Sequence, residues 1–237
     1  MSIGSIISDA LAYPLNNVKA LVVYLVLALI AAFIGGSALV GFIGAYHTTG
    51  FSSAAFAGMG IVGIIVFVLV YFLIEGYALD IVKYGIERRN DSPGIDFGRQ
   101  VSNAIKLIVV SFVYFIVPVI ITFVLGLFLR NWLVSIIALI LFIVFALANF
   151  MAKCRLAKTD DLGAALAIGE AIGDISRVGI VKILGVVAIV VIILLIIAIV
   201  VVLINKLNGM LGNVVLAIAS VYFAFFYNRA VGLLYSD

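Results

Sequence analysis

Six long apolar segments dominate the sequence and constrain its fold more than any other feature. They cover residues 20–42, 57–81, 107–129, 132–151, 183–204 and 210–233. Each is close to the roughly 20 residues that an α-helix needs to cross the hydrocarbon of a bilayer. The segments are continuous, whereas the strands of a membrane β-barrel alternate apolar and polar residues over about ten positions. The sequence therefore predicts an all-α integral membrane protein with six transmembrane helices.

The composition agrees with a single polytopic membrane domain over residues 1–237. Hydrophobic residues make up 67% of the chain and charged residues 11%, whereas about a quarter of the residues in a soluble domain are charged. The net charge of +3 could indicate an anionic partner. However, the basic residues lie beside the apolar segments, where membrane topology explains them. We therefore expect no nucleic acid among the partners.

The positions of lysine and arginine predict the orientation of the chain. Twelve of the fourteen fall on one side of the predicted spans, and only Arg130 and Lys206 fall on the other. All eleven acidic residues lie on or toward the side with the excess of positive charge. Because cytoplasmic loops carry that excess, we expect a plasma-membrane protein with both termini in the cytoplasm. The spans would form three hairpins with nearly uncharged outer turns.

A short amphipathic stretch precedes each odd-numbered span, with apolar residues at helical spacing on one face. Asp96 is expected to cap the second stretch, and Asp160 or Asp161 the third. Elements of this kind lie in the plane of the membrane surface. We therefore expect three short cytoplasmic interfacial helices. The polar face of the third would carry Glu170, Asp174 and Arg177.

This order of elements suggests an internal repeat. An interfacial helix, an outward span and a returning span occur three times, in residues 1–92, 93–160 and 161–237. Units of the same orientation would be parallel repeats about an axis along the membrane normal. A plain row of helical hairpins would give the same pattern, so both interpretations stand.

Glu75 is the most unusual residue because it lies well inside the second apolar segment. An ionisable group at that depth is costly and needs a partner or a wet cavity. Arg229 near the end of the sixth segment is the expected partner, and Asp80 competes for it. A structural ion pair between helices is favoured over a proton or cation site, because transport paths usually contain several ionisable groups. The candidate intramembrane polar site comprises Glu75, Asp80, Arg229, Asn149 and Asn228.

No combination of residues predicts catalysis. His47 belongs to the outer link, whereas the carboxylates lie toward the cytoplasm, so neither a Ser-His-Asp triad nor a carboxylate-oriented metal-binding histidine can form. Cys154 and His47 lie on opposite sides and leave zinc without a ligand set. We therefore expect no catalytic site, no metal, no cofactor and no enzymatic activity.

Several short motifs are spread over essentially the whole chain. They are AYP at 12–14, EGY at 75–77, RR at 88–89, DSPGIDF at 91–97, YFIVP at 114–118, YNRA at 227–230 and LY at 234–235. Together they resemble an uncharacterised family of multi-pass membrane proteins found largely in methanogenic archaea, domain of unknown function 4013. The resemblance implies a multi-span topology and no particular reaction.

Two classes of function fit these features. The first is a non-enzymatic component that binds membrane lipids, a membrane protein partner or further copies of itself through its spans and surface helices. The alternative is a small transporter or channel with a buried Glu75/Arg229 site. A lipid-modifying enzyme fits less well. A polar cavity that reaches Glu75 from the inner face would favour transport, and a solidly packed bundle would favour assembly.

Overall fold

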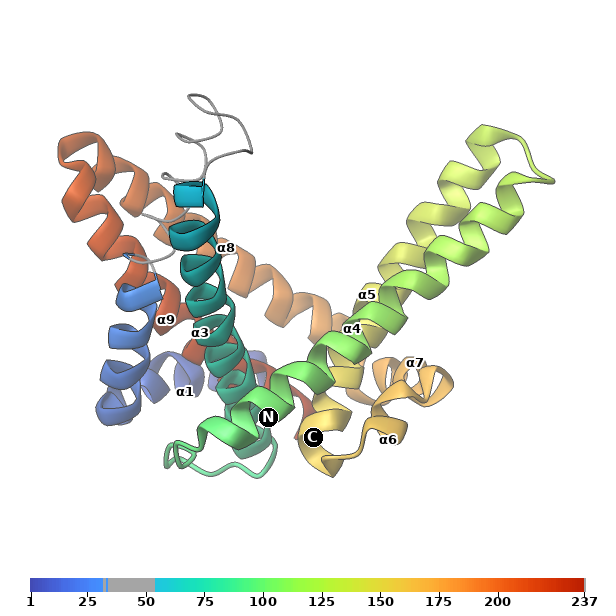
Figure 1. The fold of residues 1–237 in the computed structure, drawn as a ribbon. Coiled ribbons are helices and arrows are strands. Elements are labelled where there is room, and N and C mark those ends of the chain that lie inside the picture. The colour runs from blue at the N-terminus through green and yellow to red at the C-terminus, as the bar shows by residue number, and fades with distance from the viewer. Residues whose placement is uncertain (32, 34–53, 237) are drawn as a thin grey trace.

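The computed structural model describes residues 1–31, 33 and 54–236. Within these residues the chain is almost entirely helical and contains no strand. Short loops connect the helices, which Figure 1 shows in chain order. They are α1 (Ile3–Asn16), a helix over Val18–Ala31, α3 (Ala54–Ile86), α4 (Phe97–Gly126), α5 (Asn131–Thr159), α6 (Leu162–Leu166), α7 (Ile168–Val178), α8 (Ile180–Leu207) and α9 (Gly209–Tyr235).

Five helices are long and apolar enough to cross a membrane. They are Gly63–Ile86 of α3 and the whole of α4, α5, α8 and α9. The helices Ile3–Asn16 and Val18–Ala31 meet at 76°, and this bent pair brings the number to six if it counts as one span. The prediction of an all-helical, multi-pass membrane protein is therefore confirmed. The outer part of the first predicted span and His47 lie outside the described residues.

The interfacial elements differ in detail from the prediction. The first is the separate helix α1, whereas the second is not separate and continues into α4 without a break. No glycine pair or proline interrupts the sequence at that junction, so the helix simply extends from the surface into the apolar segment. The third consists of two helices, α6 and α7. Two predicted caps are confirmed: Asp96 accepts from the N–H of Arg99 at 3.0 Å, and Asp161 accepts from that of Ala164 at 2.9 Å.

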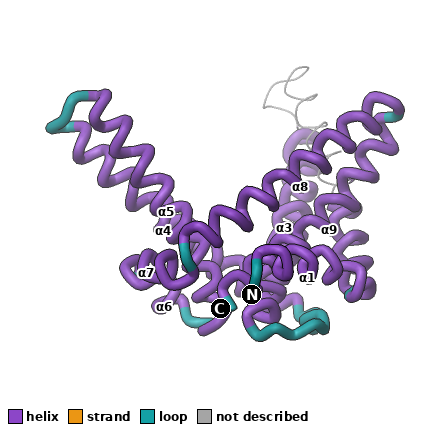
Figure 2. Tube along the Cα trace, turned by 180° about the vertical axis from the view of Figure 1, so that it is seen from behind, coloured by secondary structure: helices purple, strands orange, loops and turns teal. Residues whose placement is uncertain are grey.

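The helices diverge from a common base. In Figure 1 the α4–α5 hairpin leans away from α3, α8 and α9, so that the molecule has the outline of a V. The view from behind in Figure 2 shows the same divergence, with both termini, α6 and α7 near the base. The α4–α5 and α8–α9 turns lie at the far end. The base therefore joins the two arms of the molecule.

Two close helix crossings at the base depend on glycine. A Cβ atom at Gly76 of α3 would collide with the backbone carbonyl of Gln100 in α4. A Cβ at Gly85 would lie 2.9 Å from the Cα of Gly232 in α9. Small residues allow this close approach of backbones, which is a main source of packing energy between membrane helices. The α3 helix is thereby held against α4 on one side and α9 on the other.

Replacing Gly76 with alanine is expected to destabilise the protein. The added methyl group must force α3 and α4 apart, and overpacking of this kind costs about 1–3 kcal/mol. The measurement is the melting temperature of the detergent-solubilised protein. Gly173→Ala in α7 is the matched control, because a Cβ there meets no atom within 4 Å. Equal melting temperatures for the two variants would contradict the close crossing.

Candidate functional site

Arg229 of α9 is fully buried, and each of its three guanidinium nitrogens donates a hydrogen bond. Its side chain is 1% exposed. The Nε atom donates to Oδ1 of Asp9 at 2.8 Å, and Nη2 donates to Oδ1 of Asn90 at 3.0 Å. The Nη1 atom donates to the carbonyls of Tyr84, at 3.3 Å, and of Arg89. Arg229 therefore ties α1 and the C-terminal end of α3 to α9.

The partner of Arg229 is thus Asp9 and not the predicted Glu75. The two partners are 220 positions apart in the chain, so their contact depends on tertiary packing. Asp80 does not bind Arg229 either. Its carboxylate accepts from Arg99 at 3.0 Å and from Asn103 at 3.0 Å. Arg229 and Asp80 therefore pair with groups other than Glu75, and both join helices.

Asp174 of α7 is also buried, although the sequence placed it on a polar surface. Its carboxylate accepts from Tyr235 at 2.6 Å, Arg177 at 3.1 Å and Arg155 at 3.2 Å. Burial alone raises the pKa of this carboxyl, but the hydrogen bonds from Tyr235, Arg177 and Arg155 outweigh it and hold the pKa below its ordinary value. The carboxylate side of α7 therefore packs onto α5 and the end of α9.

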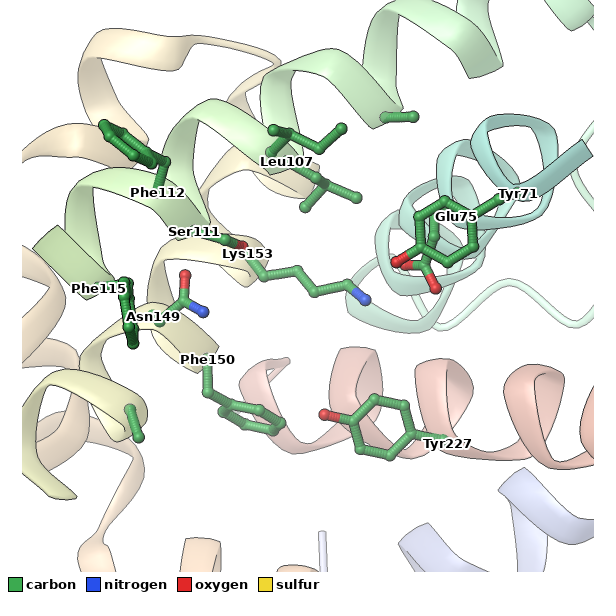
Figure 3. Close-up of a pocket in the computed structure, with 13 residues that line it drawn as sticks. Tyr71, Glu75, Leu107, Ser111, Phe112, Phe115, Asn149, Phe150, Lys153 and Tyr227 are labelled. Carbon is green, nitrogen blue, oxygen red and sulfur yellow. The ribbon is translucent and has the colours of Figure 1, made fainter. Parts of the chain in front are cut away.

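A pocket of 610 Å³ lies between α3, α4, α5 and α9. It is next to the charged base, which is the end of the molecule where Arg229, Asp80 and Asp174 form their ion pairs. Figure 3 shows its lining, with Glu75 and Tyr71 on one side and Asn149 and Ser111 on the other. Lys153 extends from α5 into the space between them. Most of the remaining lining is apolar. It consists of Ala104, Leu107, Ile108, Phe112, Phe115, Ala146 and Phe150, with Tyr227 of α9 completing the wall.

Lys153 has a fixed position in this pocket. Its Nζ donates to Oδ1 of Asn228 at 2.8 Å and lies 5.9 Å from the centre of the Tyr227 ring. The amide of Asn228 is itself held by a hydrogen bond of 2.7 Å to the carbonyl of Ala224. Asn228 therefore orients the ammonium group.

Glu75 lies close enough to Lys153 for the two charges to attract each other. Within the described part of the chain, however, they form no direct ion pair. Among the same residues, the side chains of Glu75, Asn149 and Ser111 also form no hydrogen bond. The pocket thus contains one cation, one anion, the amide of Asn149 and the hydroxyls of Ser111, Tyr71 and Tyr227.

The lining of the pocket is buried near the charged base and exposed along α4 farther from it. Ala104 and Leu107 are buried, whereas Phe112 and Phe115 are 61% and 60% exposed. A molecule would therefore reach Lys153 from the side of the exposed phenylalanines.

The structure brings together only part of the candidate polar site. Glu75 and Asn149 line the pocket, and Asn228 lies behind Lys153. Lys153 itself was missed, because it follows the apolar segment that ends at residue 151 and was counted as a loop charge. Its spacing of four residues from Asn149 was the available signal, since such residues share one face of a helix. Among the described residues, no group of three or more His, Cys, Asp or Glu side chains could hold a metal ion.

Replacing Arg229 with glutamine is expected to destabilise the folded protein strongly. The substitution leaves the Asp9 carboxylate and two backbone carbonyls without their donor, and breaking a buried ion pair costs about 3–5 kcal/mol. Thermal unfolding in detergent measures the loss. Arg130→Gln serves as the control, because Arg130 is exposed at the far end of the α4–α5 hairpin. A change no larger than that of the control would show that the network does not hold the base together.

Comparison with known proteins adds a family but no activity. The family described as "Protein of unknown function (DUF4013)" matches residues 62–206, which run from α3 to the end of α8 and include Glu75 and Lys153. No curated protein and no solved structure matches the chain. Since the matched residues make up more than half of the sequence, the chain belongs to the DUF4013 family of proteins of unknown function.

Proposed function

We propose that this protein is a non-enzymatic membrane component that holds a lipid molecule in the pocket between α3, α4, α5 and α9. The observation that carries the proposal is the combination of charged groups inside the pocket with exposed aromatic side chains at its opening. This combination matches an amphipathic molecule, which has a polar head and hydrocarbon chains.

The polar part of the pocket can bind a head group. Lys153 supplies an oriented ammonium group. Asn149 and Ser111 supply an amide and a hydroxyl that form no hydrogen bond within the described residues. Ser111 is exposed and Asn149 is half-buried, so both groups are accessible to a ligand. A head group would satisfy several of these atoms at once.

The apolar part can bind hydrocarbon. Phe112 and Phe115 lie one above the other on α4, three residues apart, and both are exposed. Exposed apolar side chains on a membrane-spanning helix contact lipid chains or another membrane protein. A lipid with its head at Lys153 would have its chains along this side of α4. The pocket is therefore accessible from within the bilayer.

The depth of the pocket agrees with a lipid from the leaflet on the charged side. Lys153 lies six residues before the end of α5 at Thr159. At 1.5 Å per residue this is about 9 Å along the helix. A head group at Lys153 would thus lie somewhat deeper than its neighbours in the leaflet. By the excess of positive charge, the charged base would face the cytoplasm, and the membrane would be the plasma membrane.

A small transporter is the second candidate function. The carboxylate of Glu75, which has no hydrogen-bond partner among the described residues, is the observation in its favour, because ionisable residues inside a membrane often mark transport paths. The transport site predicted from the sequence paired Glu75 with Arg229, whereas the pocket places Lys153 opposite Glu75. The exposed aromatic side chains at the opening favour lipid binding, since they suit hydrocarbon chains better than a small polar solute.

Lipid retention tests the proposal. The protein is extracted in a mild detergent, and mass spectrometry identifies the lipid that remains bound. We expect wild type to retain lipid and Ala146→Trp to lose it, because the indole fills the pocket. Leu139→Trp, an exposed position on the same helix outside the pocket, is the matched control and should retain lipid.

Two results would contradict lipid binding. One is equal retention by Ala146→Trp and Leu139→Trp, and the other is the absence of lipid from wild type. The transporter would be supported instead if Glu75→Gln abolished solute uptake into proteoliposomes while lipid retention stayed unchanged.

A further inference from the structure

We infer that the pocket selects a zwitterionic head group, in which an anionic phosphate is linked to a primary ammonium. The inference rests on the proposed lipid binding and adds the chemical class of the head. It follows from the presence of one positive and one negative side chain in the same pocket, Lys153 and Glu75, which form no ion pair with each other.

The phosphate would bind on the Lys153 side. The ammonium group of Lys153 donates one hydrogen bond to Asn228 and keeps two further N–H donors for a ligand. Asn149 and Ser111, which line the same side in Figure 3, add neutral donors. Phosphate oxygens accept charge-assisted hydrogen bonds, which are roughly twice as strong as neutral ones. This side of the pocket therefore fits an anion.

The ammonium would bind on the Glu75 side. Figure 3 shows the Glu75 carboxylate beside the ring of Tyr71, and both face the interior of the pocket. A primary ammonium can donate hydrogen bonds to the carboxylate and lie against an aromatic face, which attracts cations. A trimethylated ammonium has no N–H to donate and would lose the first of these contacts. The carboxylate therefore favours the primary amine.

Charge balance excludes the simpler head groups. A purely anionic head at Lys153 would leave Glu75 close to a like charge, and a purely cationic head at Glu75 would leave Lys153 in the same situation. Such repulsion is stronger in a pocket with apolar walls than in water. A zwitterion pairs with both side chains and leaves no net charge. The volume of 610 Å³ is within the range of about 300–1,000 Å³ that small-molecule pockets occupy.

Binding of short-chain lipids to the detergent-solubilised full chain tests the inference. The probes are a phosphoethanolamine lipid and a phosphoglycerol lipid with identical chains, titrated by calorimetry. Wild type should bind the phosphoethanolamine lipid roughly tenfold more tightly, the difference expected for one additional charge-assisted hydrogen bond. Equal affinities, or tighter binding of phosphoglycerol, would overturn the inference.

Two substitutions separate the roles of the charges. Glu75→Gln should weaken phosphoethanolamine binding to the level of phosphoglycerol without weakening the latter, whereas Lys153→Gln should weaken both. Glu87→Gln removes an exposed acid outside the pocket and should change neither. Loss of both lipids in Glu75→Gln would contradict the assignment if its melting temperature were unchanged. If Glu75→Gln does not fold, Glu75→Asp, which keeps the charge, must keep the preference.

The outcomes distinguish this inference from the proposed function. If wild type binds neither lipid, lipid binding itself fails and the head-group assignment fails with it. If wild type binds both lipids equally, only the head-group assignment fails. A third titration uses free phosphoethanolamine, which has the same head group and no hydrocarbon chains. Binding of this molecule as tight as that of the lipid would support the zwitterion site but would replace the membrane lipid with a soluble ligand.

Discussion

Ion pairs at one end of the helices, each with one buried partner, fix how the helices are arranged. Arg229 joins α9 to α1 through Asp9, and Arg99 joins the start of α4 to α3 through Asp80. A charge removed from water is stable only when its hydrogen bonds are satisfied, so each pair fixes its two helices in one arrangement. The helices are joined at this base and diverge beyond it. The pocket lies where they begin to separate, and its position is thus a consequence of the base.

The charged base and the pocket use the same residue types for different purposes. Each guanidinium nitrogen of Arg229 donates to a protein acceptor, and the side chain is buried, so a ligand cannot reach it. Lys153 binds one amide, and the nearby Glu75 forms no hydrogen bond or ion pair within the described residues. Satisfied charges hold a structure together, whereas charges with spare capacity inside a membrane are expensive and indicate binding. This difference is the reason for placing the ligand at Lys153 and Glu75.

The fold could be predicted from the sequence more completely than the site. Apolar length is a local property, so the segments that became α4, α5, α8 and α9 were recognisable without tertiary information. The pairing of Arg229 with Asp9 was not, because the two lie at opposite ends of the chain. Lys153 was missed for a related reason: α5 continues to Thr159, beyond its apolar segment, and Cys154, Leu156 and Ala157 of its last turns pack in the hydrophobic core. The internal repeat remains a prediction.

The central claim is that the ionised groups gather on one side of a membrane that the helices cross. Single cysteines at Glu87, Lys158, Arg130 and Lys206 test it, since all four side chains are exposed and the native Cys154 is buried. In sealed vesicles, an impermeant thiol reagent should label positions 87 and 158 from the same side and positions 130 and 206 from the other. Labelling of 87 and 158 from opposite sides would contradict the account.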